Sequence, residues 1–204
     1  MRMLAIETAT EACSVALFED DALVDFRHEI LGRGHAERLV PMIAELPGRG
    51  KAETIRVSLG PGSFTGVRIG LATARALGVA WRAEVRGFST LALVSAMAQA
   101  RQPGPVTVCM NGGHGQWFVQ NFDRQCLPEA EAASLPPDIA KAGLVHPIVA
   151  GNRAEELIES RGPEFRAITC LPDAREVLSV PRGLVTEELA PLYGRAPDAA
   201  VGRS

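Results

Sequence analysis

Three glycine-rich or hydroxyl-rich turns in this sequence have residue types that could bind a phosphate group. The longest, SLGPGSFTGVRIG at residues 58–70, holds four glycines directly before a long apolar segment. Backbone N–H groups and the helix dipole attract anions at the start of a helix, but glycines also let two backbones approach closely. The loop has no lysine to reach the β- and γ-phosphates, so it is not a P-loop.

The second interpretation of this segment is a structural loop. Its members are Gly60, Pro61, Gly62, Ser63, Phe64 and Thr65. Ser63 or Thr65 would cap the helix that follows, since short hydroxyl side chains accept hydrogen bonds from its first N–H groups. Phe64 would anchor the turn in apolar surroundings. The phosphate interpretation leads to an ATP-using enzyme, and the structural one leads to a docking subunit.

The two shorter turns give weaker signals. ETAT at residues 7–10 separates two strand-like runs, and threonines in a plain hairpin bond their own backbone. NGGHG at residues 111–115 also separates two such runs, and a type I′ turn requires Asn-Gly. His114 stands alone at a loop tip, where a histidine is usually solvated. Plain hairpins are therefore favoured at both places.

Metal and nucleophile chemistry can be judged from spacing. The histidines are His28, His35, His114 and His146, and no two stand at HxxxH or HxH spacing, which excludes a helical two-histidine metal site. The four cysteines form no CxxC pair, so a zinc ribbon or redox motif is excluded too. GPGSF is not a GxSxG nucleophile elbow, although counting leaves a Ser-His-Asp triad open. We assign no catalytic residue, no metal ligand and no cofactor.

Small residues recur every four positions in the apolar segment after the loop, at Gly66, Gly70, Ala74 and Gly78. Each glycine costs about 1 kcal/mol of helix propensity relative to alanine, so this stripe indicates close packing. The neighbour is either the protein's own sheet or first helix, or a helix of a partner. In the partner interpretation, Gly70→Arg abolishes binding and leaves the chain folded.

Arg68, Arg75 and Arg82 follow at a spacing of seven on a different helix face. A solvated helix face explains them best, and contact with RNA or with a partner's carboxylates is the alternative. The formal net charge of −3 gives no general attraction to nucleic acid. The first residues form an apolar run too short for a signal peptide, and no run approaches a membrane span. The sequence is therefore typical of a cytoplasmic protein without membrane contact.

The first half of the chain predicts strands and helices in alternation. Runs within residues 2–10, 12–18 and 22–30 predict a three-stranded meander. GHAERLVPMIAEL at residues 34–46 predicts a helix, with Pro41 as a kink or a late start. Its apolar face would hold Ala36, Leu39, Val40, Ile43 and Leu46. Residues 54–59 predict a strand that leads through the glycine-rich loop into a helix ending near Trp81.

The second half predicts a separate lobe. A strand at residues 84–90, with Ser89 or Thr90 as N-cap, precedes an apolar helix at 91–100, and RQPGP at 101–105 breaks the chain. The elements expected after it are hairpin strands at 106–110 and 116–122, a loop with a short helix at 127–143, a strand at 146–151, and helices at 152–161 and 183–190. This order fits an α/β layered fold in two lobes, residues 1–103 and 104–204.

Four segments resemble the TsaB (YeaZ) family. They are MRMLAIETATEACSVALF, GHAERLVPMI, GPGSFTGVRIGLATARAL and APLYGRAPDA, which includes Tyr193, Arg195 and Ala196. The resemblance is strong to about residue 90 and patchy beyond residue 105. It implies a two-lobed actin-like or Hsp70-like (ASKHA, ribonuclease H-like) fold. It also implies a non-catalytic scaffold that pairs with the TsaD subunit, works with the ATPase TsaE and helps to make threonylcarbamoyladenosine in tRNA.

The resemblance further implies how the partner is bound. In the family the first two helices form half of a helical bundle, and here these are residues 34–46 and 65–81. The partner-binding residues carried over are Gly66, Arg68, Gly70, Ala74, Gly78, His35, Leu39 and Ile43. A homodimer could use the same helices, and tRNA would be contacted only indirectly. TsaD holds its metal with a helical HxxxH, of which this chain has only His35.

Three features depart from active members of the fold. Glu7 stands where the family usually has Asp, ETAT contains no glycine, and Asn111 stands where an acid is usual. An asparagine cannot take a proton or bind magnesium as a carboxylate does. These differences weaken an ATP site. The rival functions are an ATP-dependent enzyme of the sugar-kinase type and a glycoprotease-like peptidase.

Overall fold

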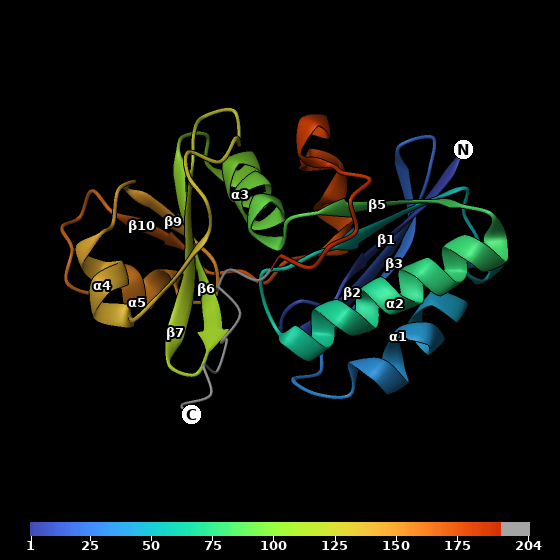
Figure 1. Ribbon diagram of the computed structural model, residues 1–204. Coiled ribbons are helices and arrows are strands. Elements are labelled where there is room, and N and C mark those ends of the chain that lie inside the picture. Colours follow the sequence, from blue (N-terminus) through green and yellow to red (C-terminus); the bar gives the residue numbers. More distant parts are fainter. Residues whose placement is uncertain (193–204) are drawn as a thin grey trace, which may run out of the picture.

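The computed structural model describes residues 1–192 and contains two five-stranded sheets (Figure 1). The first has the strand order β3-β2-β1-β4-β5. Its meander is confirmed: β1 (Arg2–Glu7), β2 (Ala12–Glu19) and β3 (Ala22–Ile30) pair antiparallel. β4 (Thr54–Ser58) and β5 (Glu84–Phe88) continue the sheet parallel to β1. The sheet is therefore mixed, as the predicted fold class requires.

Two helices lie side by side on one face of this sheet, α1 (His35–Ala44) and α2 (Phe64–Trp81) (Figure 1). Both were predicted, and the 3₁₀ turn η1 (Pro47–Gly50) follows α1. α1 runs through Pro41, which lies on its exposed side. The apolar side chains beneath the two helices form one core, which includes Leu4, Ile6, Val15, Leu17, Leu39, Met42, Ile55, Val57 and Leu71.

The predicted buried face of α1 is partly wrong. Leu39, Ile43 and Leu46 are buried as expected, whereas Ala36 and Val40 are exposed. The remaining buried positions on α1 are His35 and Met42. Apolar residues occur on both sides of this short helix, so periodicity alone predicted a buried face that is rotated from the observed one and includes Ala36 and Val40 instead of His35 and Met42.

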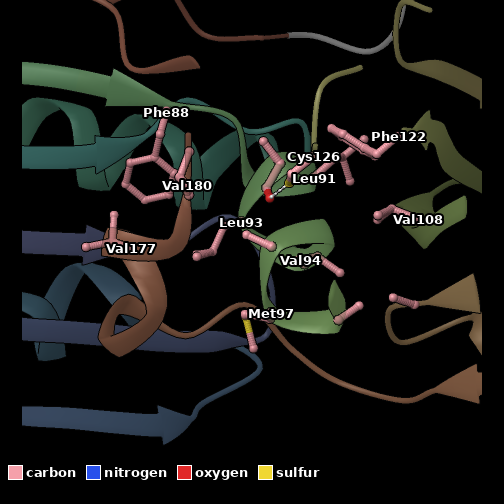
Figure 2. Packing of buried hydrophobic residues seen from close by; sticks show 14 of the residues in the cluster. Phe88, Leu91, Leu93, Val94, Met97, Val108, Phe122, Cys126, Val177 and Val180 are labelled. Atoms are coloured by element: carbon pink, nitrogen blue, oxygen red, sulfur yellow. Dashed lines mark hydrogen bonds between the residues drawn. The ribbon is translucent and has the colours of Figure 1, made fainter. Parts of the chain in front are cut away.

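A third helix, α3 (Thr90–Arg101), joins the two sheets and is buried from Thr90 to Ala98. Ser89 is its N-cap, as predicted, because Ser89 Oγ accepts the Ala92 N–H at 3.4 Å. Figure 2 shows the surroundings of α3, with side chains toward the first sheet on one side of it and side chains toward the second sheet on the other. The labelled side chains are Leu91, Leu93, Val94 and Met97 of α3, Phe88, Val177 and Val180 toward the first sheet, and Val108, Phe122 and Cys126 toward the second.

The second sheet has the order β10-β9-β6-β7-β8. β6 (Val106–Gly113) and β7 (Gln116–Phe122) form the predicted hairpin, and β9 (Ile148–Ala150) with α5 (Ala154–Ile158) confirms the predicted strand and helix. α4 (Pro137–Ala142) is the expected short helix. Two three-residue strands were not predicted, β8 (Ala133–Leu135) and β10 (Arg166–Ile168).

The chain then returns to the first sheet. The 3₁₀ turn η2 (Ala174–Ser179) packs on the sheet face opposite α1 and α2 (Figure 1). Thr186 pairs with Gly87 of β5, and the Leu192 N–H donates to Leu59 O at 2.7 Å. The predicted helix at residues 183–190 is therefore wrong. Only η3 (Arg182–Leu184) forms a helical turn there, because the pairing with β5 requires an extended backbone.

Within residues 1–192, no helix is long and apolar enough to cross a membrane. Tyr193, Arg195 and Ala196, which contribute to the family resemblance, lie outside the described residues.

Candidate functional site

The glycine-rich loop lies against the first turn of the same chain. A Cβ atom on Gly62 would overlap with Ala9 O, and one on Gly66 would overlap with Thr8 O. The Ser63 N–H, which a phosphate would need, donates to Ala9 O at 2.7 Å. The Thr8 hydroxyl donates to Gly66 O at 2.8 Å. The glycines therefore allow two backbones to meet, and the structural-loop interpretation is the one that the geometry supports.

Within the loop, Ser63 caps the helix that follows, and Phe64 is exposed to solvent. Ser63 is the N-cap of α2, since its Oγ accepts the Gly66 N–H at 3.2 Å, while Thr65 is exposed. Phe64 is 56% exposed, so its predicted apolar anchoring is wrong. Instead its ring lies 3.5 Å from the guanidinium carbon of Arg68, a cation–π contact.

The other two loop positions connect it to neighbouring elements. Pro61 is buried and follows Gly60 across a cis peptide bond. Gly60 has a positive φ of 87°, and its carbonyl accepts the Thr90 N–H at 2.8 Å. The loop thus joins the first turn, α2 and the start of α3 into one unit.

Glu7 sits inside this unit and is completely buried. Its Oε1 accepts the Ala9 N–H at 2.6 Å, and its Oε2 accepts the Thr90 hydroxyl at 3.2 Å. Burial raises the pKa of Glu7 to about 7, although the hydrogen bonds to the carboxylate oppose that rise. The sequence predicts Glu7 in a turn, whereas the structure places it at the buried end of β1. The apolar run that precedes Glu7 is the signal in the sequence for this burial.

The second turn closes differently from the prediction. Gly113 pairs with Gln116, so the two central residues of the turn are His114 and Gly115 rather than Asn111 and Gly112. Both have positive φ, as a type I′ turn requires, and so does Gly113 before them. Asn111 is the site of a bulge in β6, and its N–H donates to Asn152 Oδ1 at 2.8 Å.

A polar contact connects this second hairpin to the first turn region. Asn152 Nδ2 donates to Glu11 Oε1 at 3.0 Å, while Asn152 Oδ1 accepts from Asn111. Glu11 lies just before β2, so one asparagine spans the gap between the two hairpins. The Asn152 side chain thus links the second hairpin to the residue that precedes β2.

The described residues contain no cluster of three or more acidic, histidine or cysteine side chains able to hold a metal. His35 is buried, and its Nε2 lies 3.2 Å from Ala12 O. Ser14, His28 and Asp173 do come together, with Ser14 Oγ 3.4 Å from Asp173 Oδ1 and His28 Nδ1 3.6 Å from Asp173 Oδ2.

This trio is not a nucleophilic triad. Ser14 is completely buried and contacts the carboxylate rather than the histidine, while its Oγ accepts the Ala174 N–H at 3.0 Å. Burial raises the pKa of Asp173, but hydrogen bonds from Arg175 outweigh it and hold that pKa below the ordinary value. The trio attaches η2 to the meander, so the peptidase alternative gains no support from it.

The small-residue stripe of α2 faces the protein's own sheet. Gly66, Gly70, Ala74 and Gly78 are all buried. A Cβ atom on Gly70 would overlap with Thr8 Oγ1, and one on Gly78 would lie 2.5 Å from Val85 Cγ2. The assignment of these four residues to direct partner contact is therefore corrected, and Gly70→Arg would disturb the fold. His35, Leu39 and Ile43 are likewise buried beneath α1.

The opposite sides of α1 and α2 carry small apolar residues that are exposed. We call this set the outward face, and it consists of Ala36, Val40, Ala44, Ala72, Ala76 and Val79. Val40 is 54% exposed and Val79 is 83% exposed. α2 has no acidic residue, and it exposes Arg68 and Arg75 beside these alanines. Such a surface can receive another helix at close range, with arginines at its margin.

Known proteins that are similar to this chain belong to tRNA threonylcarbamoyladenosine synthesis. Residues 28–134 match the family model described as "TsaD: tRNA N6-adenosine threonylcarbamoyltransferase". The protein named "tRNA threonylcarbamoyladenosine biosynthesis protein TsaB" of Escherichia coli (strain K12) is 45% identical over 96 residues, which is 45% of this chain and 41% of that protein. The protein of the same name in Haemophilus influenzae is 38% identical over 105 residues, 49% of this chain and 43% of that protein.

These alignments span less than half of the length of the curated relatives. Solved structures cover more of the chain. "YeaZ from Pseudomonas aeruginosa" has a TM-score of 0.77 at 28% identity, covering 94% of this chain and 99% of that one. "An uncharacterized protein with similarity to peptidase YEAZ from Pseudomonas aeruginosa" also has a TM-score of 0.77, at 29% identity, and covers 95% and 99% of the two chains.

Proposed function

Because the chain belongs to the TsaB (YeaZ) family, we propose that it is a non-catalytic subunit that pairs with a TsaD-type catalytic subunit. The pair would transfer a threonylcarbamoyl group to adenosine in tRNA, and this chain would supply no reacting group. The relatives named above are biosynthesis proteins of this modification. The proposed role assigns the chain to the cytoplasm.

The observation that carries the proposal is the outward face of α1 and α2. Val79 at 83% exposure and Val40 at 54% exposure lie among exposed alanines on two adjacent helices. Exposed apolar surface that is contiguous and edged by charge is typical of protein–protein interfaces. A second helix pair from the catalytic subunit would cover this face and complete a bundle.

The remaining parts of the proposal follow from this docking. A TsaE-type ATPase would act on the assembled pair, and tRNA would be contacted mainly through the catalytic subunit. A second copy of the chain would occupy the same face when the catalytic subunit is absent. Dimerisation and pairing would then compete.

The activity test is tRNA threonylcarbamoylation by the cognate TsaD-type subunit, supplied with threonylcarbamoyl-AMP and the TsaE-type ATPase. We expect modification to depend on adding this chain. Modification at the same rate without it would contradict the scaffold role. Calorimetry with ATP addresses the sugar-kinase alternative, since tight binding by the isolated chain would favour that alternative.

The docking test uses Ala76→Arg and Val79→Arg, with Val145→Arg as a matched control at a 57% exposed valine of the second lobe. A bulky charged side chain at the centre of the interface should weaken binding to the catalytic subunit by at least about tenfold. Central apolar contacts, which it would break, contribute about 1–2 kcal/mol or more to binding. The control should bind normally. Normal binding by both docking variants would remove the outward face from the proposal.

A further inference from the structure

The strand β3 forms an edge of the first sheet. It is the terminal strand in the order β3-β2-β1-β4-β5, so within residues 1–192 its only strand neighbour is β2. β3 is 9 residues long and exposes four large apolar side chains, Leu23 at 46%, Val24 at 41%, Phe26 at 36% and Ile30 at 71%. A long edge strand with exposed apolar side chains is a template for pairing with another strand.

The backbone groups of β3 point alternately toward β2 and away from the sheet. Leu31, which follows β3, donates its N–H to Glu11 O at 2.9 Å on the β2 side. Alternation from Leu31 therefore directs the N–H and C=O groups of Phe26, His28 and Ile30 away from the sheet. The Phe26 N–H agrees with this, because it donates to the carboxylate of the preceding residue at 2.8 Å. Within residues 1–192, no other group bonds the outward backbone groups of His28 or Ile30.

The side chains of β3 lie alternately on the two faces of the sheet. Arg27 and Glu29 lie on the face that α1 covers, where each forms an ion pair with the α1 segment. Phe26 and Ile30 lie on the opposite face. There the guanidinium carbon of Arg175 lies 4.2 Å from the centroid of the Phe26 ring. The edge thus carries two opposite charges on one face and two apolar side chains on the other.

We propose that a second copy of this chain pairs with β3 in antiparallel orientation, with the two-fold axis at His28. This register places Arg27 of each copy opposite Glu29 of the other copy, and Phe26 opposite Ile30. Opposite charges and apolar side chains directly across an antiparallel pair stabilise it. The outward backbone groups of the two strands then bond each other, and these main-chain bonds supply affinity while the side-chain pairs set the register.

The two neighbouring registers that keep the outward backbone groups facing each other are disfavoured by charge. One places Asp25 opposite Glu29, and the other places the two Glu29 side chains opposite each other. Like charges directly across a strand pair are destabilising. In the proposed register, Phe26 exchanges its local hydrogen bonds with Asp25 and Arg27 for bonds to the second copy. The proposal does not rest on the proposed function, because it uses the backbone of β3 rather than the outward face.

The first test is oxidative cross-linking of two whole-chain variants, Phe26→Cys and Ile30→Cys, mixed in equal amounts and treated with copper–phenanthroline. Residues opposite each other in a hydrogen-bonded antiparallel pair have Cα atoms about 5.5 Å apart, which suits a disulfide. We expect a cross-linked dimer from the mixture, and none from the parent or from either variant alone. No dimer from the mixture, or a comparable yield from one variant alone, would overturn the proposal.

The same cross-link separates the β3 edge from the outward face. Val79→Arg, added to both cysteine variants, should leave the yield unchanged, because Val79 lies on α2. Loss of the cross-link in the presence of Val79→Arg would mean that the copies meet through the outward face, and it would overturn pairing through β3.

Sedimentation velocity over a concentration series tests the pairing without a cross-link. Ile30→Arg changes a 71% exposed side chain and sets a cation opposite the contact between Phe26 and Arg175 of the other copy. The dissociation constant of the dimer should rise about tenfold or more, because symmetry removes the pair of Phe26 and Ile30 twice. Val145→Arg, at a 57% exposed valine, is the matched control and should dimerise like the parent.

Urea unfolding accompanies this comparison, and equal midpoints for Ile30→Arg and the parent would show that the variant folds normally. A parent that stays monomeric over the whole series would overturn the second copy as the occupant and leave the edge of β3 to a strand of another protein. Equal dissociation constants for Ile30→Arg and Val145→Arg would overturn the proposal as well.

Discussion

The carboxyl group of Glu7 should make this protein less stable as the pH rises toward neutrality. Glu7 is completely buried, and burial raises its pKa from the ordinary value of 4.5 to about 7. The folded state therefore binds a proton that the unfolded state has released, wherever the pH lies between these two values. The variant Glu7→Gln keeps the shape of the side chain and resembles its protonated form.

The size of the effect follows from the two pKa values. Stability depends on pH through the difference in bound protons between the unfolded and folded states. The favourable contribution of protonated Glu7 is complete below pH 4.5, declines as the pH rises through the window, and is lost above about pH 7. A shift of this size corresponds to roughly 3 kcal/mol across the window.

Urea unfolding of the parent protein and of Glu7→Gln, at several pH values between 4 and 8, measures how the free energy of unfolding of each depends on pH. The free energy of unfolding of the parent should fall by up to roughly 3 kcal/mol over that range relative to Glu7→Gln. The variant should be the more stable of the two at pH 8. The interpretation fails if both proteins show the same pH dependence, or if Glu7→Gln is the less stable at pH 8.

Three other substitutions test the glycine-rich loop and the contact between the second hairpin and Glu11. Ser63→Ala removes the cap of α2 and should cost about 1 kcal/mol in urea unfolding; an unchanged midpoint would mean that the cap contributes nothing. Gly70→Ala displaces the Thr8 hydroxyl from Gly66 O, its buried hydrogen-bond partner. We expect the free energy of unfolding to fall by about 1–2 kcal/mol, although alanine has the better helix propensity. A gain in stability would contradict the packing. Asn152→Ala removes the contact between Glu11 and the second hairpin. Amide exchange at Asn111 should then accelerate, and unchanged protection there would show that the contact is dispensable.

Local pattern was sufficient for most elements of the fold. The meander, the helix after the glycine-rich loop and the hairpin at β6 and β7 each have a strong period or turn signal within one short segment. β8 and β10 have three residues each and pair with strands formed elsewhere in the chain, so no local signal exists for them. Residues 183–190 have helix-forming composition, but the pairing of Thr186 with Gly87 prevents a helix.

The site was harder to predict than the elements. Ser63 was among the predicted caps because its role depends on neighbours in sequence. Glu7 accepts a hydrogen bond from Thr90, which is distant along the chain, so its surroundings are not visible in the local sequence. The exposure of Phe64 depends on where its ring lies relative to Arg68 and the solvent. Sequence spacing reports that residues share a helix face, but it does not report what lies opposite that face.

The two sides of α2 show why it matters for function what lies opposite each face of a helix. Positions two apart on an α-helix are rotated by about 200° from one another, so Gly70 and Ala72 belong to opposite sides. Gly70 brings the helix close to its own sheet, while Ala72 and Ala76 leave its outer surface low enough for another helix to approach. The same spacing of small residues thus serves folding on one side and, in our proposal, docking on the other. The two roles should separate by measurement: Gly70→Ala should lower stability but leave the affinity of the folded protein unchanged, and Ala76→Arg should do the reverse. If both variants lost affinity and stability together, the two sides of α2 would not be independent, and the docking surface would have to be sought elsewhere on the fold.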